Sequence, residues 1–245
     1  MSFYTDFAAH YEKIFPFRPA TLAFLRRHLP ARGRIIDLGC GTGHYAGALA
    51  AAGLEAVGLD LDEAMVEAAR RRYRGAQFVA TDLTEVRAVV ATAQGAFCIG
   101  NVLPHLAPAA RAQFLRDLAV VLPPGAPWLA QTVNFDRLLP LSAPHDLPPI
   151  EAGGGLVFAR RYEPGPGASI RFVTALMRAD PSKQDQEDSE TVFTGETVLW
   201  PLASRELAAA NAAAGFHLQD QWGGFGGEVF DAAGSGACVQ VYRRE

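Results

Sequence analysis

The order of apolar and polar residues along this chain follows two patterns, and the change occurs just past its midpoint. In the first half, short apolar runs precede longer stretches in which apolar residues recur every three or four positions. Short apolar runs are typical of buried strands, and the longer spacing is typical of helices. Alternating strand and helix patterns predict a parallel sheet with covering helices.

The amino-terminal stretch is predicted to be helical, with a break at Pro16 and Pro19 and a second helix that ends at Pro30. Ser204 is the expected amino cap of the last helix, and Gly215 its expected end. The predicted strands are residues 35–38, 56–59, 77–80, 96–100, 128–133, 216–218 and 238–242. The predicted later helices are residues 63–74, 107–122 and 205–214.

From about residue 134 to residue 201 the helical spacing disappears. Apolar and polar residues alternate over 156–162, a Pro-Gly turn follows at 164–167, and a second run covers 170–176. Residues 191–199 fit a third strand, and the acidic run 185–190 before it reads as a solvated connection. We therefore predict an inserted antiparallel β unit.

The chemistry is concentrated where the first two strands end. The first strand runs directly into Gly39, Gly41 and Gly43. Glycine lets the chain reverse sharply while a ligand lies on its backbone. The second strand ends in Asp60, whose carboxylate can accept hydrogen bonds from both hydroxyls of a ribose. These positions predict a nucleoside-containing ligand.

The loop itself narrows the choice of nucleoside. Its pattern is GxGxG, so the GxGxxG fingerprint of dinucleotide sites is incomplete, and no Lys follows the glycines as in a P-loop. An oxidoreductase that uses Asp60 on an NAD ribose stays open as an alternative. A regulatory module that binds a cofactor without turnover stays open as another.

The chain resembles the class I S-adenosylmethionine-dependent methyltransferases over residues 33–135, and in particular their small-molecule, glycine N-methyltransferase-like group. The resemblance implies an α/β fold: a Rossmann-like, doubly wound, mostly parallel seven-stranded sheet with an antiparallel last strand. The inserted β unit is expected to cover the substrate site. The implied reaction is in-line methyl transfer from S-adenosylmethionine to a nitrogen or oxygen of a small molecule, with S-adenosylhomocysteine as product.

The resemblance also implies roles for individual residues. Asp37 and the glycine loop would hold the amino-acid end of the cofactor, Asp60 the ribose, and Asp82 the adenine amino group. The alternatives are purely structural roles: Asp60 could cap the next helix, as Asp62 is expected to do, and Asp82 could be a turn residue. The expected cofactor-binding set is Asp37, Gly39, Cys40, Gly41, Gly43, Asp60, Leu61, Met65, Thr81, Asp82, Leu83 and Asn101.

Candidates for catalysis and substrate binding are fewer. His105 follows the fourth strand and titrates near neutral pH, so it is a candidate general base, with a structural histidine as the alternative. The resemblance implies that the amino-terminal helix lies over the cofactor, which makes Tyr11 a second catalytic candidate and Tyr4 a candidate for substrate binding. The alternative for Tyr11 is a core residue on an amphipathic helix. Arg160 and Arg171 could bind a substrate carboxylate, although exposed strand charges explain them equally.

These expectations divide the chain into four segments. Residues 1–32 form an amino-terminal helical lid and 33–135 the cofactor-binding core, while 136–201 form the substrate roof and 202–245 complete the core. The roof is expected to select the methyl acceptor, and its sequence does not name that molecule.

Composition excludes several partners. With 245 residues and a formal net charge of -4, the chain can bury one core and has no basic footprint for nucleic acid. It also lacks the Asn/Asp-Pro-Pro-aromatic and Pro-Cys motifs of the DNA methyltransferases that it would otherwise resemble. Three cysteines without CxxC spacing indicate neither disulfides nor a metal site, and a cytoplasmic location is expected. No apolar run is long enough for a membrane span, and a homodimer is left open.

Overall fold

The computed structural model describes residues 10–178 and 190–245, so Tyr4 and most of the acidic run 185–190 lie outside the described residues. The chain divides into two compact units. The larger contains residues 17–139 and 202–245, and the smaller contains residues 1–16 and 140–201. The predicted division into lid, core and roof also assigns a functional role to each segment, and these roles stay predictions.

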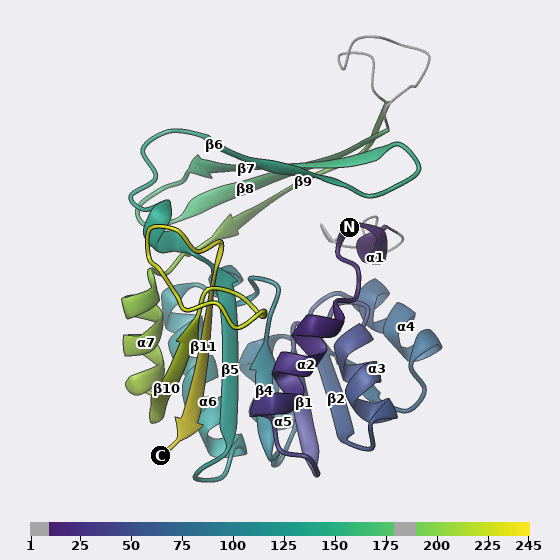
Figure 1. The fold of residues 1–245 in the computed structure, drawn as a ribbon, viewed down its shortest axis with the longest axis vertical. Coiled ribbons are helices and arrows are strands. Elements are labelled where there is room, and N and C mark those ends of the chain that lie inside the picture. The colour runs from purple at the N-terminus through teal and green to yellow at the C-terminus, as the bar shows by residue number, and fades with distance from the viewer. Residues whose placement is uncertain (1–9, 179–189) are drawn as a thin grey trace. The chain divides into compact units, whose positions relative to one another are not determined.

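A seven-stranded sheet forms the centre of the larger unit, in the order β10-β11-β5-β4-β1-β2-β3 (Figure 1). Strand β11 is antiparallel to both of its neighbours, and the other neighbouring pairs are parallel. The predicted fold class is therefore confirmed. The strands are β1 (Arg34–Leu38), β2 (Glu55–Asp60), β3 (Gln77–Ala80), β4 (Gly95–Cys98), β5 (Pro127–Val133), β10 (Phe216–Trp222) and β11 (Ala237–Arg244).

Helices cover both faces of this sheet, which explains why its strands read as continuous apolar runs (Figure 1). Because successive side chains of a strand point to opposite faces, Ile35 packs with α2, α3 and α4, and Ile36 packs on the other side with α5, α6 and α7. The helices are α2 (Pro19–His28), α3 (His44–Ala51), α4 (Glu63–Arg72), α5 (Val86–Val89), α6 (Pro108–Val121), α7 (Ser204–Ala212), and the 3-10 turns η1 (Leu83–Glu85), η2 (Leu103–His105) and η3 (Phe135–Arg137).

One helix cap is as predicted and one is not. The Asp62 carboxylate accepts the Met65 N–H at 3.0 Å and caps α4. The cap position of α7 is Ala203, so the prediction that Ser204 caps this helix is wrong. Instead, the remote carboxylate of Asp136 accepts hydrogen bonds from the Ser204 N–H at 2.8 Å and from its hydroxyl at 3.2 Å. The hydrogen-bond acceptor at the start of α7 is therefore a residue distant in the sequence, and not the local cap that the sequence predicted.

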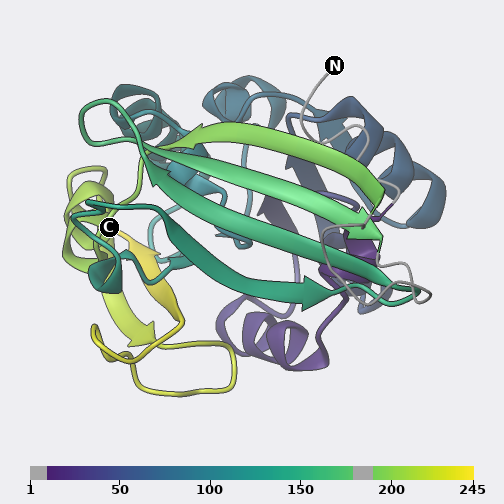
Figure 2. The same cartoon turned by 90° about the horizontal axis from the view of Figure 1, so that it is seen from above.

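The smaller unit is a four-stranded antiparallel sheet, in the order β6-β7-β8-β9, together with the short helix α1 (Tyr11–Ile14). Figure 2 shows the strands β6 (His145–Glu151), β7 (Leu156–Pro164), β8 (Ile170–Arg178) and β9 (Glu190–Leu199) side by side. Strand β6 was not predicted, because Pro148 and Pro149 argue against a strand. It is an edge strand with a register shift between Leu147 and Ile150, where proline is tolerated.

No helix within the described residues combines the length and apolar character needed to cross a membrane.

Candidate cofactor site

The loop between β1 and α3 is built from three left-handed glycines. Gly39, Gly41 and Gly43 have φ angles of +77°, +54° and +79°, which other residues rarely adopt. The N–H groups of Gly39 and Cys40 both donate to the Leu59 carbonyl, at 2.7 and 3.0 Å. The loop is therefore fastened to the end of the neighbouring strand β2.

Close packing gives two of these glycines a further reason. A Cβ at Gly39 would lie 2.5 Å from a methyl carbon of Val102, and one at Gly43 would lie 2.4 Å from the ring of Phe78. The absence of a side chain at Gly39 allows the segment after β4 to pack closely on the loop, and its absence at Gly43 allows the start of α3 to pack on β3. The sequence predicted a ligand-bearing turn here, and the structure adds that any side chain would displace neighbouring residues.

Two carboxylates stand beside this loop, at the ends of adjacent parallel strands: Asp37 is buried and Asp60 is partly buried. The two Asp60 oxygens accept the Gly41 N–H at 2.7 Å and the Asp62 N–H at 3.0 Å. Because Asp62 caps α4, the alternative that Asp60 caps it is not what the structure shows. Burial raises the pKa of Asp37 to about 8, with a further contribution from the negative charge of Asp60. Burial likewise raises the pKa of Asp60. Such a pair favours a ligand that brings positive charge.

The ends of β2 and β3 supply the next candidates. Leu61 is 74% exposed and offers an apolar surface, whereas Met65 is 1% exposed and lies in the core. One oxygen of Asp82, Oδ1, accepts the N–H and hydroxyl of Thr84 at 2.8 and 2.7 Å, as a turn residue would. Its Oδ2 has no hydrogen bond within the described residues and is available to a ligand. Leu83 is buried.

The segment after β4 contains two consecutive left-handed residues, Gly100 and Asn101, with φ angles of +84° and +65°. They end the strand at Cys98, although the sequence predicted a strand to residue 100. Two hydrogen bonds to β5 hold them, from the Gly100 N–H to Gln131 Oε1 at 2.6 Å and from the Val133 N–H to Asn101 Oδ1 at 2.9 Å. Gln131 was missed, although a glutamine inside an apolar strand was a usable signal.

The proposed catalytic residues are less clearly placed. His105 ends η2, and burial lowers its pKa to about 4. Its imidazole is therefore neutral at pH 7 and is a weak base. Tyr11 packs on Phe15 in the smaller unit, with ring centroids 5.3 Å apart. The catalytic roles of His105 and Tyr11 stay predictions.

The two predicted substrate arginines differ in their surroundings. Arg171 forms ion pairs with Glu163 and Glu196, which favours the alternative that it is an exposed strand charge. Arg160 has no carboxylate within 4.0 Å among the described residues.

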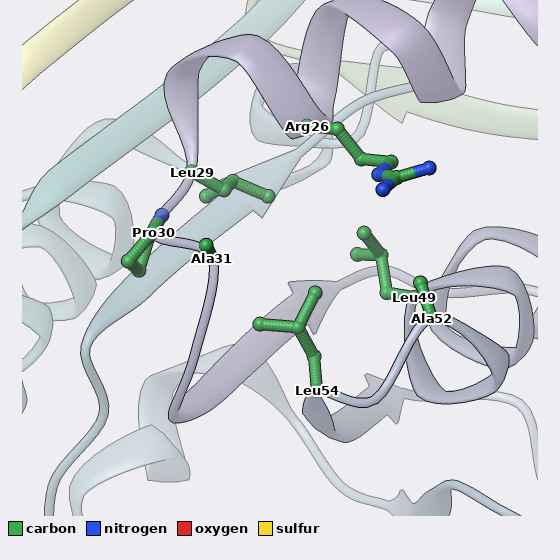
Figure 3. Close-up of a pocket in the computed structure, with 7 residues that line it drawn as sticks. All are labelled: Arg26, Leu29, Pro30, Ala31, Leu49, Ala52 and Leu54. Atoms are coloured by element: carbon green, nitrogen blue, oxygen red, sulfur yellow. The ribbon is translucent and has the colours of Figure 1, made fainter.

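A small cavity of about 100 Å³ lies elsewhere in the larger unit, where Leu29, Leu49 and Leu54 point toward one another (Figure 3). Pro30 and Leu54 precede β1 and β2, so the cavity is at the edge where the parallel strands begin. Ligands of open α/β sheets bind at the opposite edge, beyond the carboxyl ends. The cavity is therefore separate from the glycine loop. Its lining is Arg26, Leu29, Pro30, Ala31, Leu49, Ala52 and Leu54.

Residues 35–125 match the family described as a methyltransferase domain. YqeM of Bacillus subtilis (strain 168), a proposed methyltransferase, is 34% identical over 88 residues. That match covers 34% of this chain and only 36% of the length of YqeM.

Solved structures match over nearly the whole chain. An S-adenosylmethionine-dependent methyltransferase from Clostridium acetobutylicum ATCC 824 has a TM-score of 0.78 at 12% identity, with 98% of each chain covered. CalS10, an amino pentose methyltransferase from Micromonospora echinaspora solved with bound S-adenosylmethionine, has a TM-score of 0.65 at 22% identity, with 99% of this chain and 92% of CalS10 covered. These matches confirm the resemblance seen in the sequence: the chain contains a methyltransferase domain and has the fold of the class I S-adenosylmethionine-dependent methyltransferases.

Proposed function

We propose that this chain transfers a methyl group from S-adenosylmethionine to a nitrogen or oxygen atom of a small molecule. The observation that carries the proposal is the glycine loop after β1, whose Gly41 N–H is bonded to the Asp60 carboxylate beside buried Asp37. This arrangement stands at the carboxyl ends of β1 and β2, the edge where open α/β sheets bind ligands.

The side chains at this edge suit the parts of S-adenosylmethionine. Asp37 and Asp60 have raised pKa values, and a sulfonium or ammonium group bound beside them would favour their negatively charged forms. Each Asp60 oxygen accepts one backbone N–H and retains capacity for a ribose hydroxyl. Leu61 provides exposed apolar surface for adenine, and Asp82 Oδ2 provides an acceptor for its amino group. When bound, the cofactor supplies an activated methyl group, and the chain has to orient the acceptor and exclude water.

A small-molecule acceptor is supported by the net charge of -4, which gives nucleic acid no basic surface. CalS10, with the same fold, is named as an amino pentose methyltransferase, so amines are the first acceptors to test. We place the protein in the cytoplasm, because its cysteines Cys40, Cys98 and Cys238 are all free and buried.

Isothermal calorimetry tests the cofactor. We expect S-adenosylmethionine and S-adenosylhomocysteine to bind and NAD to give no heat, because the loop lacks the third glycine of a dinucleotide site. Release of S-adenosylhomocysteine over a panel of amino sugars, other amines and alcohols tests turnover. NAD binding without response to the sulfur nucleosides would support the oxidoreductase, and cofactor binding without any turnover would support the regulatory module.

The affinity for S-adenosylhomocysteine is expected to rise with pH, by up to about tenfold per pH unit between about pH 6 and about pH 8. The reason is that Asp37, with a pKa of about 8, is largely protonated in the free protein and must ionise to bind the ammonium group.

The stability of the ligand-free protein should depend on pH in the opposite direction. Its free energy of unfolding should fall from about pH 4 to about pH 8, because the folded state holds the Asp37 proton more tightly than the unfolded state. Asp37→Asn should flatten both dependences, and unchanged slopes in that variant would contradict the assignment.

A further inference from the structure

Arg160 differs from the other arginines in the strands of the inserted sheet. The others have carboxylate partners, in the pairs Arg161–Asp146, Arg171–Glu163, Arg171–Glu196 and Arg178–Glu190. Arg160 has none within the described residues, and its hydrogen bond from Nη2 to the Pro148 carbonyl, at 2.8 Å, uses one of its donors. Its Nε is buried without a partner. This guanidinium therefore keeps unused donors on Nε and Nη1.

The face of the sheet around Arg160 is apolar and aromatic. Because side chains alternate along a strand, Arg160 shares its face with Phe158 and Tyr162, which are 1% and 2% exposed. Burial lowers the pKa of Arg160. Arg161, the next residue, points to the other face and pairs with Asp146 at 2.6 Å. The two adjacent arginines thus stand in opposite environments.

The register of β7, β8 and β9 places small residues beside Arg160. It stands opposite Thr174, which stands opposite Gly195, and these three strands lie side by side in Figure 2. The rows on either side carry larger side chains, Tyr162 with Phe172 and Phe158 with Leu176. The row through Arg160 is therefore the one with the least side-chain bulk between two aromatic rows.

A half-buried charge without a counter-ion is unfavourable, and an anionic ligand that paired with it would offset this cost. A guanidinium binds groups with two or more oxygens through paired N–H donors. We propose that Arg160 binds an oxyanion of the methyl acceptor, a carboxylate or a phosphate, and that the acceptor's carbon skeleton lies on the neighbouring aromatic side chains. The acceptor would then be an anionic small molecule. This inference rests on the proposed function in so far as the bound molecule is a methyl acceptor. The anion site itself can be tested separately.

The anion site is tested by NMR of the arginine Nε–H groups, with inorganic phosphate and acetate as probes. The Arg160 signal is identified as the one missing in Arg160→Gln. We expect it to shift saturably with at least one probe, while the Arg161 signal, assigned with Arg161→Gln, stays in place. An Arg160 signal that does not respond to either probe, or that moves no more than the Arg161 signal, would overturn the site.

The acceptor class is tested with matched pairs, glucosamine 6-phosphate against glucosamine and 4-aminobenzoate against 4-aminobenzamide. Arg160→Gln should lower kcat/KM for the charged member of an accepted pair by about 10- to 150-fold, the range for hydrogen bonds to a charged group, and leave the neutral member within about twofold. The pair that responds distinguishes phosphate from carboxylate. Arg161→Gln, on the other face of the same strand, should change neither member.

Equal losses for charged and neutral members, or no loss at all, would overturn the acceptor class. If the wild-type chain turns over none of a broad acceptor panel while its Arg160 signal responds to an anion, the proposed function fails and the anion site stands. If turnover occurs but the Arg160 signal is unresponsive, the proposed function stands and this inference fails.

Discussion

Asp60→Ala should bind S-adenosylhomocysteine about 10- to 150-fold more weakly than the wild-type chain, a loss of about 1.5 to 3 kcal/mol for hydrogen bonds to a charged group. We expect this carboxylate to serve two purposes. In the proposed function it accepts ribose hydroxyls, and in the structure it accepts the Gly41 N–H at 2.7 Å and the Asp62 N–H at 3.0 Å. Its removal therefore deletes the expected hydrogen bonds to the ligand and also those that hold the glycine loop. Calorimetry on the folded variant gives the affinity.

Asp62→Ala is the matched control for this experiment. Asp62 is next to the site, but its side chain caps α4 by accepting the Met65 N–H, and its own backbone N–H to Asp60 survives the substitution. We expect it to lower the free energy of unfolding by about 0.5 to 2 kcal/mol and to leave the affinity nearly unchanged. A well-folded Asp60→Ala protein with wild-type affinity would show that this carboxylate only braces the loop.

Gly43→Ala should lower the free energy of unfolding by about 2 to 5 kcal/mol. The left-handed φ of +79° contributes about 1 to 2 kcal/mol of this loss. The added Cβ, which would lie 2.4 Å from the Phe78 ring and 2.8 Å from the Ala69 Cβ, contributes about 1 to 3 kcal/mol through overpacking. Urea unfolding of the ligand-free proteins measures the total.

Gly53→Ala separates the two contributions. Gly53 also has a left-handed φ, of +91°, but a Cβ there would meet nothing within 4 Å. It should therefore lose only the backbone contribution, about 1 to 2 kcal/mol. Equal losses in the two variants would mean that α3 and β3 move apart at little cost, and that close packing does not explain the glycine at position 43.

The sequence was sufficient to predict the strands of the larger unit and its longer helices, because these elements are specified locally. The four-residue helix α5 was not predicted. Each central strand is covered on both faces, so it needs an unbroken apolar run such as residues 35–38. Each long helix has one buried side, which leaves a repeat of three or four residues. The acids Asp37 and Asp60 could be placed at one edge for the same reason, since parallel strands end together.

Features that depend on distant residues could not be predicted in this way. Ser204 has the composition of a cap, but Asp136 supplies the acceptor from after β5. Strand β6 contains two prolines and is possible only because it is an edge strand beside β7. Asn101 tolerates a left-handed φ because Gln131 and Val133 hold the segment from β5.

The sequence by itself determined the fold class, the glycine loop and the acids around it, because spacing and residue type are enough to specify strand ends and tight turns. Only the tertiary structure decided how those groups behave. Burial raises the pKa of Asp37 to about 8 and lowers that of His105 to about 4, and burial is a property of the packed chain. The tertiary structure also distinguished the two candidate substrate arginines, because ion pairs between strands depend on register. Arg171 is paired with two glutamates, whereas Arg160 has no counter-ion among the described residues.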